Sequence, residues 1–329
     1  MKKFIFQSIF IFIFPFILII YSINYVLNFP TKYTIDKGTN HVLVKWNEIK
    51  NPNEQFDNII LGSSRAYNAY NPKIIDSITS NSTYNMATSS QNIIESYYVL
   101  KEVLKYQSPK KIIYEIFVPQ FTNTDFYHIM LNAHFMSNQG KWDMILNGYH
   151  QKGLTNIFNP LLKHKPYLKN EITSVFNLMK SSTQNISNTG SNISKNRYLI
   201  KGYMYDNFII DSIQASKMGP LTYNIDDSLA IFIKEKLELI IKLCNENNIE
   251  LICVRAPYPR TRINGTLEDK SSIFFTNFLD IKGIPFYDFN YYKNNNFYDS
   301  DFTDHHHINS KGASKVSKKL GEILKELNQ

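Results

Sequence analysis

The sequence predicts a three-layer α/β/α domain, in which helices cover both faces of a parallel sheet. Short apolar runs recur along the chain, helical patterns lie between them, and polar turns separate the two. Such an alternation of strands and helices is typical of a parallel sheet that is covered on both sides. The chain has 329 residues, of which 43% are hydrophobic, so it is long enough for one large domain or two small ones.

The individual elements follow from apolar runs and from capping residues. Five runs are predicted to be strands, at residues 58–61, 83–87, 112–118, 249–254 and 284–287. Three helices are predicted: one capped by Ser89 or Ser90 that reaches about residue 106, one opened by Asp226 and Asp227, and a final one capped by Ser310. Residues 56–329 are therefore expected to form the main domain.

Residues 122–224 interrupt this alternation and are predicted to be an insertion. The stretch is rich in aromatic residues, with helical segments expected at 126–146 and 172–179. A Ser/Asn/Thr-rich loop follows at residues 181–196. We expect the insertion to pack over the carboxyl edge of the sheet.

The N-terminus is predicted to be a membrane anchor. Lys2 and Lys3 precede an uncharged and mostly apolar run at residues 4–27, which is as long as a membrane-spanning helix needs. A cleaved signal peptide and a buried N-terminal helix remain alternatives, although no typical cleavage site precedes Pro30. The two lysines favour a cytoplasmic N-terminus. We therefore expect an anchor at 1–28, a polar stalk at 29–55 and an extracytoplasmic C-terminal domain.

Charge and cysteine content narrow the function classes. The net charge of +8 is spread along the chain, which suits a negatively charged envelope surface or glycopolymer, or simply a solvated basic surface. No nucleic-acid-binding motif is present, so no nucleic-acid partner is expected. Cys244 and Cys253 lie in apolar segments and are expected to be buried.

A turn after the first strand carries a candidate nucleophile. Gly62, Ser63 and Ser64 follow the run at 58–61 directly. Glycine permits a tight turn, and ligands of open α/β sheets bind at the carboxyl ends of the strands. Ser64 could thus meet a substrate at this edge, whereas the alternatives are an ordinary turn or a helix cap.

A candidate base lies just before the final helix, in the segment from Asp304 to His307. Serine needs a base that takes its proton, and a histidine held by a carboxylate supplies one. A polar loop is one alternative. A metal site that uses the three histidines with Asp301 and Asp304 is another. Neighbouring residues rarely point at one ion, so we predict neither a metal nor a cofactor.

These two segments resemble the first and last sequence blocks of the SGNH (GDSL-like) hydrolase superfamily. The residues after His307, from Ile308 to Ala313, are also similar to that family. The resemblance covers about residues 56–121 and 226–329. It implies a flavodoxin-like sheet, with Ser64 as the nucleophile, His307 as the base and Asp304 as the acid that orients it.

The resemblance also implies an oxyanion hole. In the family this hole is formed by the backbone N–H of the nucleophile, a glycine N–H and an asparagine side chain. Here Ser64 supplies the first and Ser90 takes the place of the glycine. Pro119 falls at the place of the asparagine, so Gln120 is the nearest amide donor. Loss of one oxyanion donor typically slows turnover a hundredfold or more.

The single anchor and the Gly-Ser-Ser turn resemble a membrane-anchored subgroup of this family. Its members act in O-acetylation of exopolysaccharides or D-alanylation of teichoic acids, beside a multi-spanning membrane acyltransferase. The anchor and the Gly-Ser-Ser turn are consistent with that role. We therefore expect acyl transfer or ester hydrolysis on an envelope or extracellular glycan. Arg65 and Arg255 are expected to bind the substrate, because arginine suits carboxylate and phosphate groups. The alternative is a catalytically silent protein that binds glycan or scaffolds an assembly.

Overall fold

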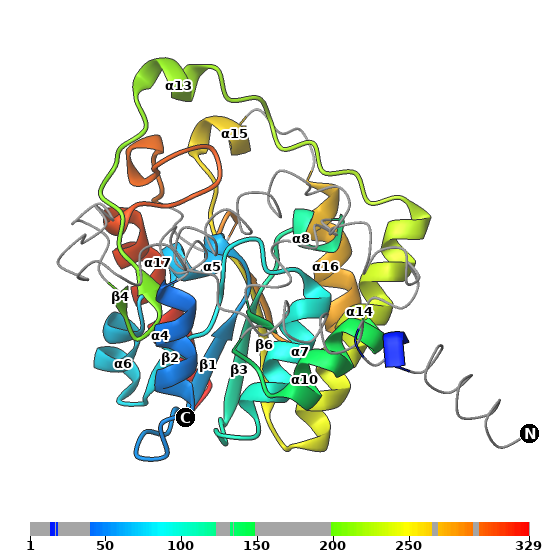
Figure 1. Ribbon diagram of the computed structural model, residues 1–329. Coiled ribbons are helices and arrows are strands. Elements are labelled where there is room, and N and C mark those ends of the chain that lie inside the picture. Colours follow the sequence, from blue (N-terminus) through cyan, green and yellow to red (C-terminus); the bar gives the residue numbers. More distant parts are fainter. Residues whose placement is uncertain are drawn as a thin grey trace, which may run out of the picture. The chain divides into compact units, whose positions relative to one another are not determined.

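The computed structural model describes residues 14–16, 18, 40–122, 132–133, 135–148, 199–264, 269–291 and 296–328. Five parallel strands form the main sheet, in the order β2-β1-β3-β6-β7 (Figure 1). Their bounds are β1 Asn58–Leu61, β2 Thr83–Asn85, β3 Lys111–Glu115, β6 Glu250–Arg255 and β7 Phe286–Asp288. The predicted α/β class with a parallel sheet is confirmed.

The strand order places a topological switch point at β1. The chain runs from β1 to β2 on one side and then returns to β3 on the other side of β1. This is the order of a flavodoxin-like doubly wound sheet, in which ligands bind outside the carboxyl ends of the strands at the switch point. The turn after β1 therefore occupies the position where such folds bind ligands.

Helices cover both faces of the sheet, because alternate residues of each strand point to opposite sides. Ile59, Ile112 and Leu251 belong to one buried cluster, whereas Ile60 and Ile113 belong to the other. The first cluster includes residues of α4 (Asn40–Ile49), α7 (Ile93–Val103), α14 (Asp227–Glu246) and α16 (Lys270–Ile281). The second includes residues of α5 (Ser64–Ala69), α6 (Pro72–Thr79) and α17 (Ser310–Glu326).

Polar caps set where the long helices begin. Asn92, rather than the predicted Ser89 or Ser90, caps α7 by accepting from the backbone N–H of Glu95, and Asp226 caps α14 at its predicted start. The start of α17 differs from the prediction by one residue. Asn309, rather than Ser310, accepts from the backbone N–H groups at the helix start. Asparagine is among the best N-cap residues, so it can compete with the adjacent serine.

The predicted stalk at 29–55 is wrong for the part that the structure describes. Residues 40–49 form α4, in which Val42, Trp46 and Ile49 are fully or almost fully buried. These three residues lie four and three positions apart, so they share one face of the helix. This face packs into the first cluster, and α4 is therefore part of the domain.

The insertion is described in part. It contains α10 (Asn138–Asp143), a π-helix η3 (Met144–Gly148), the antiparallel pair β4 (Leu199–Ile200) and β5 (Tyr203–Met204), and α13 (Ser212–Ser216). The predicted segments at 172–179 and 181–196 lie outside the described residues. The remaining short elements are α8 (Pro119–Thr122), α15 (Arg260–Asn264) and η5 (Asp299–Asp301).

The predicted anchor at 1–28 lies almost entirely outside the described residues. Only residues 14–16 and 18 are described, and they are helical. Within the described part of the chain, none of the helices combines the length and apolar character needed to cross a bilayer. The expected burial of Cys244 and Cys253 is confirmed, since both are fully buried in the first cluster.

Candidate active site

The turn after β1 places Ser64 at the first position of α5. Gly62 has a φ of 145°, which is a conformation that side-chain-bearing residues rarely adopt. A Cβ at this position would lie 3.0 Å from the Cβ atoms of both Ala66 and Glu115. Ser63 is buried and caps α5 by accepting from the backbone of Arg65 at 3.3 Å. The turn thus fixes Ser64 at the carboxyl edge of the sheet.

A tight turn before α17 presents the histidine. One carboxylate oxygen of Asp304 accepts from the backbone N–H groups of His306 at 2.7 Å and of His307 at 2.8 Å. The backbone N–H of Thr303 donates to the carbonyl of His307 at 2.8 Å and closes the loop. Asp304 therefore shapes the loop as well as facing the imidazole.

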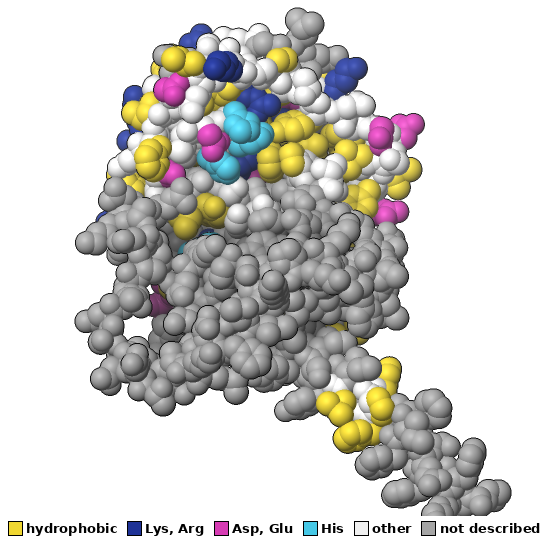
Figure 2. All heavy atoms as spheres, turned by 45° about the horizontal axis from the view of Figure 1, so that its top comes forward, with side chains coloured by type: hydrophobic (Ala, Val, Ile, Leu, Met, Phe, Trp, Pro, Cys, Tyr) yellow, Lys and Arg dark blue, Asp and Glu magenta, His cyan; other side chains and the backbone are white. Residues whose placement is uncertain are grey.

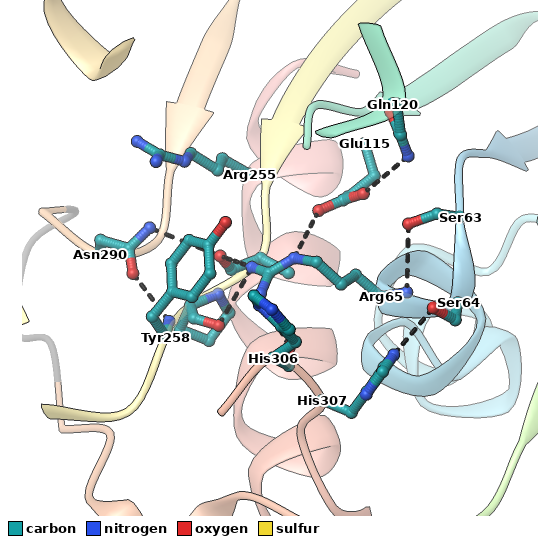
Figure 3. A network of polar contacts seen from close by, with 12 residues as sticks. Ser63, Ser64, Arg65, Glu115, Gln120, Arg255, Tyr258, Asn290, His306 and His307 are labelled. Carbon is teal, nitrogen blue, oxygen red and sulfur yellow. Dashed lines mark hydrogen bonds and ion pairs between the residues drawn. The ribbon is translucent and has the colours of Figure 1, made fainter. Parts of the chain in front are cut away.

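The structure brings Ser64, His307 and Asp304 together. The Oγ of Ser64 lies 2.8 Å from Nε2 of His307, and Nδ1 of His307 lies 2.8 Å from Oδ2 of Asp304. Nδ1 must carry a proton to donate to a carboxylate, so Nε2 of the neutral ring is left to accept from the serine hydroxyl. This arrangement (Figure 3 shows the Ser64–His307 contact) has the hydrogen-bond geometry expected of a serine nucleophile and its base.

The carboxylate of Asp304 is ionised at neutral pH. Burial opposes ionisation, but the hydrogen bond and electrostatic interaction with His307, together with the two backbone N–H groups, outweigh it. They hold the pKa of Asp304 well below its usual range. An ionised carboxylate can stabilise the imidazolium that forms when His307 takes a proton.

The three adjacent histidines have different surroundings. His305 is exposed, whereas the ring of His306 packs edge-on against Phe117 and Tyr258. Burial and the nearby positive charge of Arg65 lower the pKa of His306 to about 3, so its ring is neutral. Among the described residues, no group of three or more potential ligands is arranged to hold a metal ion. The metal alternative therefore gains no support from the described side chains.

The expectation that Arg65 binds substrate is corrected by its burial. Only 1% of Arg65 is exposed, and its guanidinium group donates to Glu115 and to backbone carbonyls within the fold. A substrate cannot displace these partners without breaking a buried ion pair. Figure 3 shows the side chain extending away from Ser64, toward Glu115 and Tyr258.

Arg255 is corrected for the same reason. It ends β6, as the sequence indicated, but its side chain is fully buried. The guanidinium group donates to Asp269 at 2.7 Å, to Asp288 at 3.0 Å and to Ser271 at 3.1 Å. These bonds tie β6 to β7 and to the start of α16.

Two of the three predicted oxyanion donors, Ser64 and Ser90, have backbone N–H groups that could serve this role. Ser64 and Ser90 keep backbone N–H groups for which no acceptor is found among the described residues. Ser90 has a φ of 53°, in the region that favours glycine. This agrees with the sequence comparison, in which Ser90 takes the place of the family's glycine. The backbone N–H of Thr88 donates to the carbonyl of Gly62 at 3.2 Å, so the loop before Ser90 is attached to the end of β1.

Gln120 uses its side chain inside the fold. The residue is buried. In the amide orientation that gives both of its polar atoms a hydrogen-bond partner, its oxygen accepts from the backbone N–H of Ser63 at 2.9 Å. In this orientation its nitrogen donates to the hydroxyl of Tyr114 and the carbonyl of Glu115. The expectation that Gln120 supplies an oxyanion donor is therefore corrected. It supports the turn that carries Ser64 instead.

Sequence reasoning missed a buried polar network below the loop that carries Ser90. Asn132 donates to Thr88 at 2.7 Å and to Glu95 at 2.8 Å, and it accepts from the indole of Trp46 at 3.0 Å. Burial raises the pKa of Glu95 to about 8. The adjacent Lys45 on α4 donates to the carbonyl of Ala87. The available signal was a lysine beside the apolar face of α4.

At the surface, histidine side chains gather beside basic and acidic groups and an apolar area (Figure 2). This is the face at the top of Figure 1, turned toward the viewer in Figure 2. The side chains of His307 and Asp304 are 29% and 43% exposed, so both are accessible to solvent.

Comparisons with known proteins give little beyond this geometry. No family profile and no curated protein matches the chain. Among solved structures, the chain is similar to a candidate acylhydrolase from Bacteroides fragilis, with 10% sequence identity and a TM-score of 0.39. The match covers 89% of this chain and 98% of the other. At this level the similarity carries no argument for function, which depends on the site itself.

Proposed function

We propose that the chain is a serine-dependent enzyme that hydrolyses or transfers acyl esters. The observation that carries this proposal is the hydrogen-bond chain from Ser64 through His307 to Asp304, with both contacts at 2.8 Å. Its place at the switch point of a doubly wound sheet supports the proposal, since ligands of such folds bind there.

The first step forms an acyl-enzyme. Nε2 of His307 takes the hydroxyl proton of Ser64 while Oγ attacks the carbonyl carbon of the ester, whose electron pair moves to the carbonyl oxygen. Asp304 stabilises the resulting imidazolium. Collapse of the tetrahedral intermediate breaks the bond to the leaving alcohol, which receives the proton from Nε2. The product of this step is an ester on Ser64.

The second step repeats this chemistry with another nucleophile. Water or a sugar hydroxyl gives its proton to His307 and attacks the acyl carbon. Collapse returns the proton to Oγ of Ser64 and releases an acid or an acylated sugar. Hydrolysis and transfer therefore use the same residues and differ only in the acceptor.

The developing oxyanion would be held by backbone groups. The N–H of Ser64 lies at the first turn of α5, where backbone donors lack partners in the helix. The N–H of Ser90 is the second proposed donor. Without an amide side chain from Gln120, we expect slower turnover than in a site with three donors.

We further propose that the acyl acceptor or donor is an envelope or extracellular glycan. The uncharged run at residues 4–27 after Lys2 and Lys3 supports a single-pass anchor with the domain outside. The net charge of +8 supports a negatively charged polymer or surface as the partner. A multi-spanning membrane acyltransferase would then supply the acyl group.

The second candidate function is a catalytically silent glycan-binding or scaffolding protein. The inward position of Gln120 favours it, because a conventional site has one more oxyanion donor. Fluorophosphonate labelling separates the two functions. We expect the wild type and Ser77→Ala, which changes an exposed serine of α6, to be labelled, and Ser64→Ala to be unlabelled. A wild-type protein that is folded yet unlabelled would favour the silent alternative.

A further inference from the structure

The side chain next to the candidate nucleophile is bonded to the backbone next to the candidate base. Nη1 of Arg65 donates to the carbonyl of His306 at 2.7 Å. Ser64 and His307 are the covalent neighbours of these two residues, and their side chains meet at 2.8 Å. The nucleophile and the base are thus joined through a second connection, which runs through Arg65 rather than through the reacting atoms (Figure 3).

The other bonds of the same guanidinium group fix its place. Nε donates to Glu115 at 3.2 Å, at the end of β3. Nη2 donates to the carbonyls of Ala256 at 2.5 Å and Pro257 at 3.2 Å, just after β6. Arg65 therefore connects the segments at the ends of three neighbouring strands, β1, β3 and β6, and holds the histidine loop against them.

Packing immobilises the guanidinium plane further. Its central carbon lies 3.8 Å from the ring centre of Tyr258 and 5.2 Å from that of Phe117. Arg65 and Glu115 are 1% and 0% exposed. Burial raises the pKa of Glu115, and the charge of Arg65 opposes this rise. The guanidinium group is therefore held in place and excluded from solvent, unlike a mobile surface side chain.

We propose that Arg65, with Glu115 as its counter-ion, is a positioning residue that sets the distance between Ser64 and His307. The inference deepens the proposed function and rests on it for its catalytic consequence. A planar group with donors in fixed directions can serve a carboxylate and three carbonyls at once, whereas an ammonium is a point charge on a flexible stem. Lysine at this position would keep the charge but could not make all of these hydrogen bonds at once.

Arg255→Lys is the matched control for Arg65→Lys. Arg255 is also fully buried and paired with carboxylates, but among the described residues none of its hydrogen bonds reaches the histidine loop. We expect Arg65→Lys to lower the rate of fluorophosphonate labelling and kcat for a nitrophenyl ester about 100-fold, because small misplacements of reacting groups have effects of that size. KM should stay nearly unchanged. Arg255 also packs against Tyr258, with its central carbon 5.5 Å from the ring centre, but the hydrogen bonds described for it go to Asp269, Asp288 and Ser271. In Arg255→Lys the labelling rate should therefore stay within about threefold of wild type.

Crystal structures of the two variants provide a readout that does not depend on catalysis. In Arg65→Lys we expect the contact between Ser64 Oγ and His307 Nε2 to lengthen beyond hydrogen-bonding distance, while Arg255→Lys keeps it. Equal loss of labelling in both lysine variants, in proportion to lower thermal stability, would refute the proposal and indicate a purely structural ion pair. An unchanged contact in folded Arg65→Lys would refute it too.

Failure of the proposed function gives a different pattern. An unlabelled wild type would remove the catalytic role, while the variant structures would still decide whether Arg65 sets the contact. If Arg65→Lys does not fold, the double variant Arg65→Met with Glu115→Gln removes both buried charges together. This variant should fold and show the same lengthened contact, and wild-type labelling by it would overturn the proposal.

Discussion

Replacement of Asp304 by asparagine is the most informative change to the proposed triad. In the wild type one carboxylate oxygen holds the loop backbone and the other faces Nδ1 of His307. Asparagine can keep its oxygen on the backbone N–H groups, but its amide nitrogen then faces Nδ1. Two N–H groups cannot bond, so His307 must carry its proton on Nε2. That nitrogen can then no longer take the proton of Ser64.

The structure predicts a large effect on rate and a small one on stability. Loss of the correct tautomer costs about 10⁴-fold in kcat in serine hydrolases with this arrangement, which corresponds to about 5 kcal/mol in the barrier. The side chains of Asp304 and His307 are 43% and 29% exposed. A pair this accessible to solvent contributes at most about 1 kcal/mol to the free energy of unfolding.

The pH dependence follows from the lowered pKa of Asp304. A carboxyl group whose pKa is lower in the folded state stabilises the fold above its unfolded pKa of about 3.9. That contribution disappears as the pH falls through the folded value. The difference in unfolding free energy between wild type and Asp304→Asn should therefore shrink below about pH 4.

The assay is steady-state ester hydrolysis together with urea unfolding of the same preparations. Asp226→Asn is the matched control, because Asp226 caps α14 and asparagine caps a helix equally well. The control should behave as wild type in both measurements. Wild-type turnover in Asp304→Asn would refute the assignment of Asp304, and unfolding of this variant at neutral pH would show that the exposed-pair argument is wrong.

Three further changes test the supports of the site. Gly62→Ala should unfold more easily by about 1–3 kcal/mol in urea and label more slowly, because alanine is strained at this φ and crowds Ala66 and Glu115. Ser90→Gly should label at the wild-type rate, since the proposed donor is a backbone N–H. Thermal unfolding should show this variant slightly stabilised, because glycine adopts the positive φ of this position readily. Slower labelling would show that the Ser90 side chain takes part. Burial lowers the pKa of Lys45 to about 7, so the unfolding free energy of wild type relative to Lys45→Met should rise between about pH 7 and pH 10 by up to about 1.4 kcal/mol per pH unit.

The sheet could be predicted from the sequence because its strands are short apolar runs with clear ends. The prediction for β1 has the observed bounds, since Gly62 follows its buried residues directly. The third strand was predicted to extend to residue 118 but ends at Glu115. In its apolar continuation the backbone N–H of Ile116 still donates to the carbonyl of Val254 at 2.7 Å, whereas Val118 is buried beyond the end of the strand. An apolar run reports burial, and it does not report where the hydrogen-bonded ladder stops.

Helix α16 and the role of α4 were not predicted. In α4 the decisive contact joins Trp46 to Asn132, 86 positions along the chain. Local periodicity over ten residues cannot reveal such a partner. The sequence therefore suggests a stalk, because the helix lies in a polar stretch between the predicted anchor and the predicted sheet domain.

The two arginines show a similar limit of sequence reasoning. Arginine is normally exposed, so Arg65 and Arg255 at strand ends suggested substrate contacts. Their actual partners are carboxylates such as Glu115, 50 positions from Arg65. A glutamate inside an apolar strand was the available signal, because a buried carboxylate needs a partner. Gln120 was misread for a related reason, since the sequence places it near the edge but does not show which way its amide points.

The central claim is that an acyl group passes through Ser64, and rapid-quench analysis with 4-nitrophenyl acetate tests it most directly. We expect a burst of about one nitrophenolate per chain, as for a ping-pong serine enzyme, and an acetyl group on the peptide that contains Ser64. Ser64→Ala should show neither the burst nor the acetylated peptide. Wild-type turnover without acetylation of Ser64, or an equal burst in Ser64→Ala, would contradict the account.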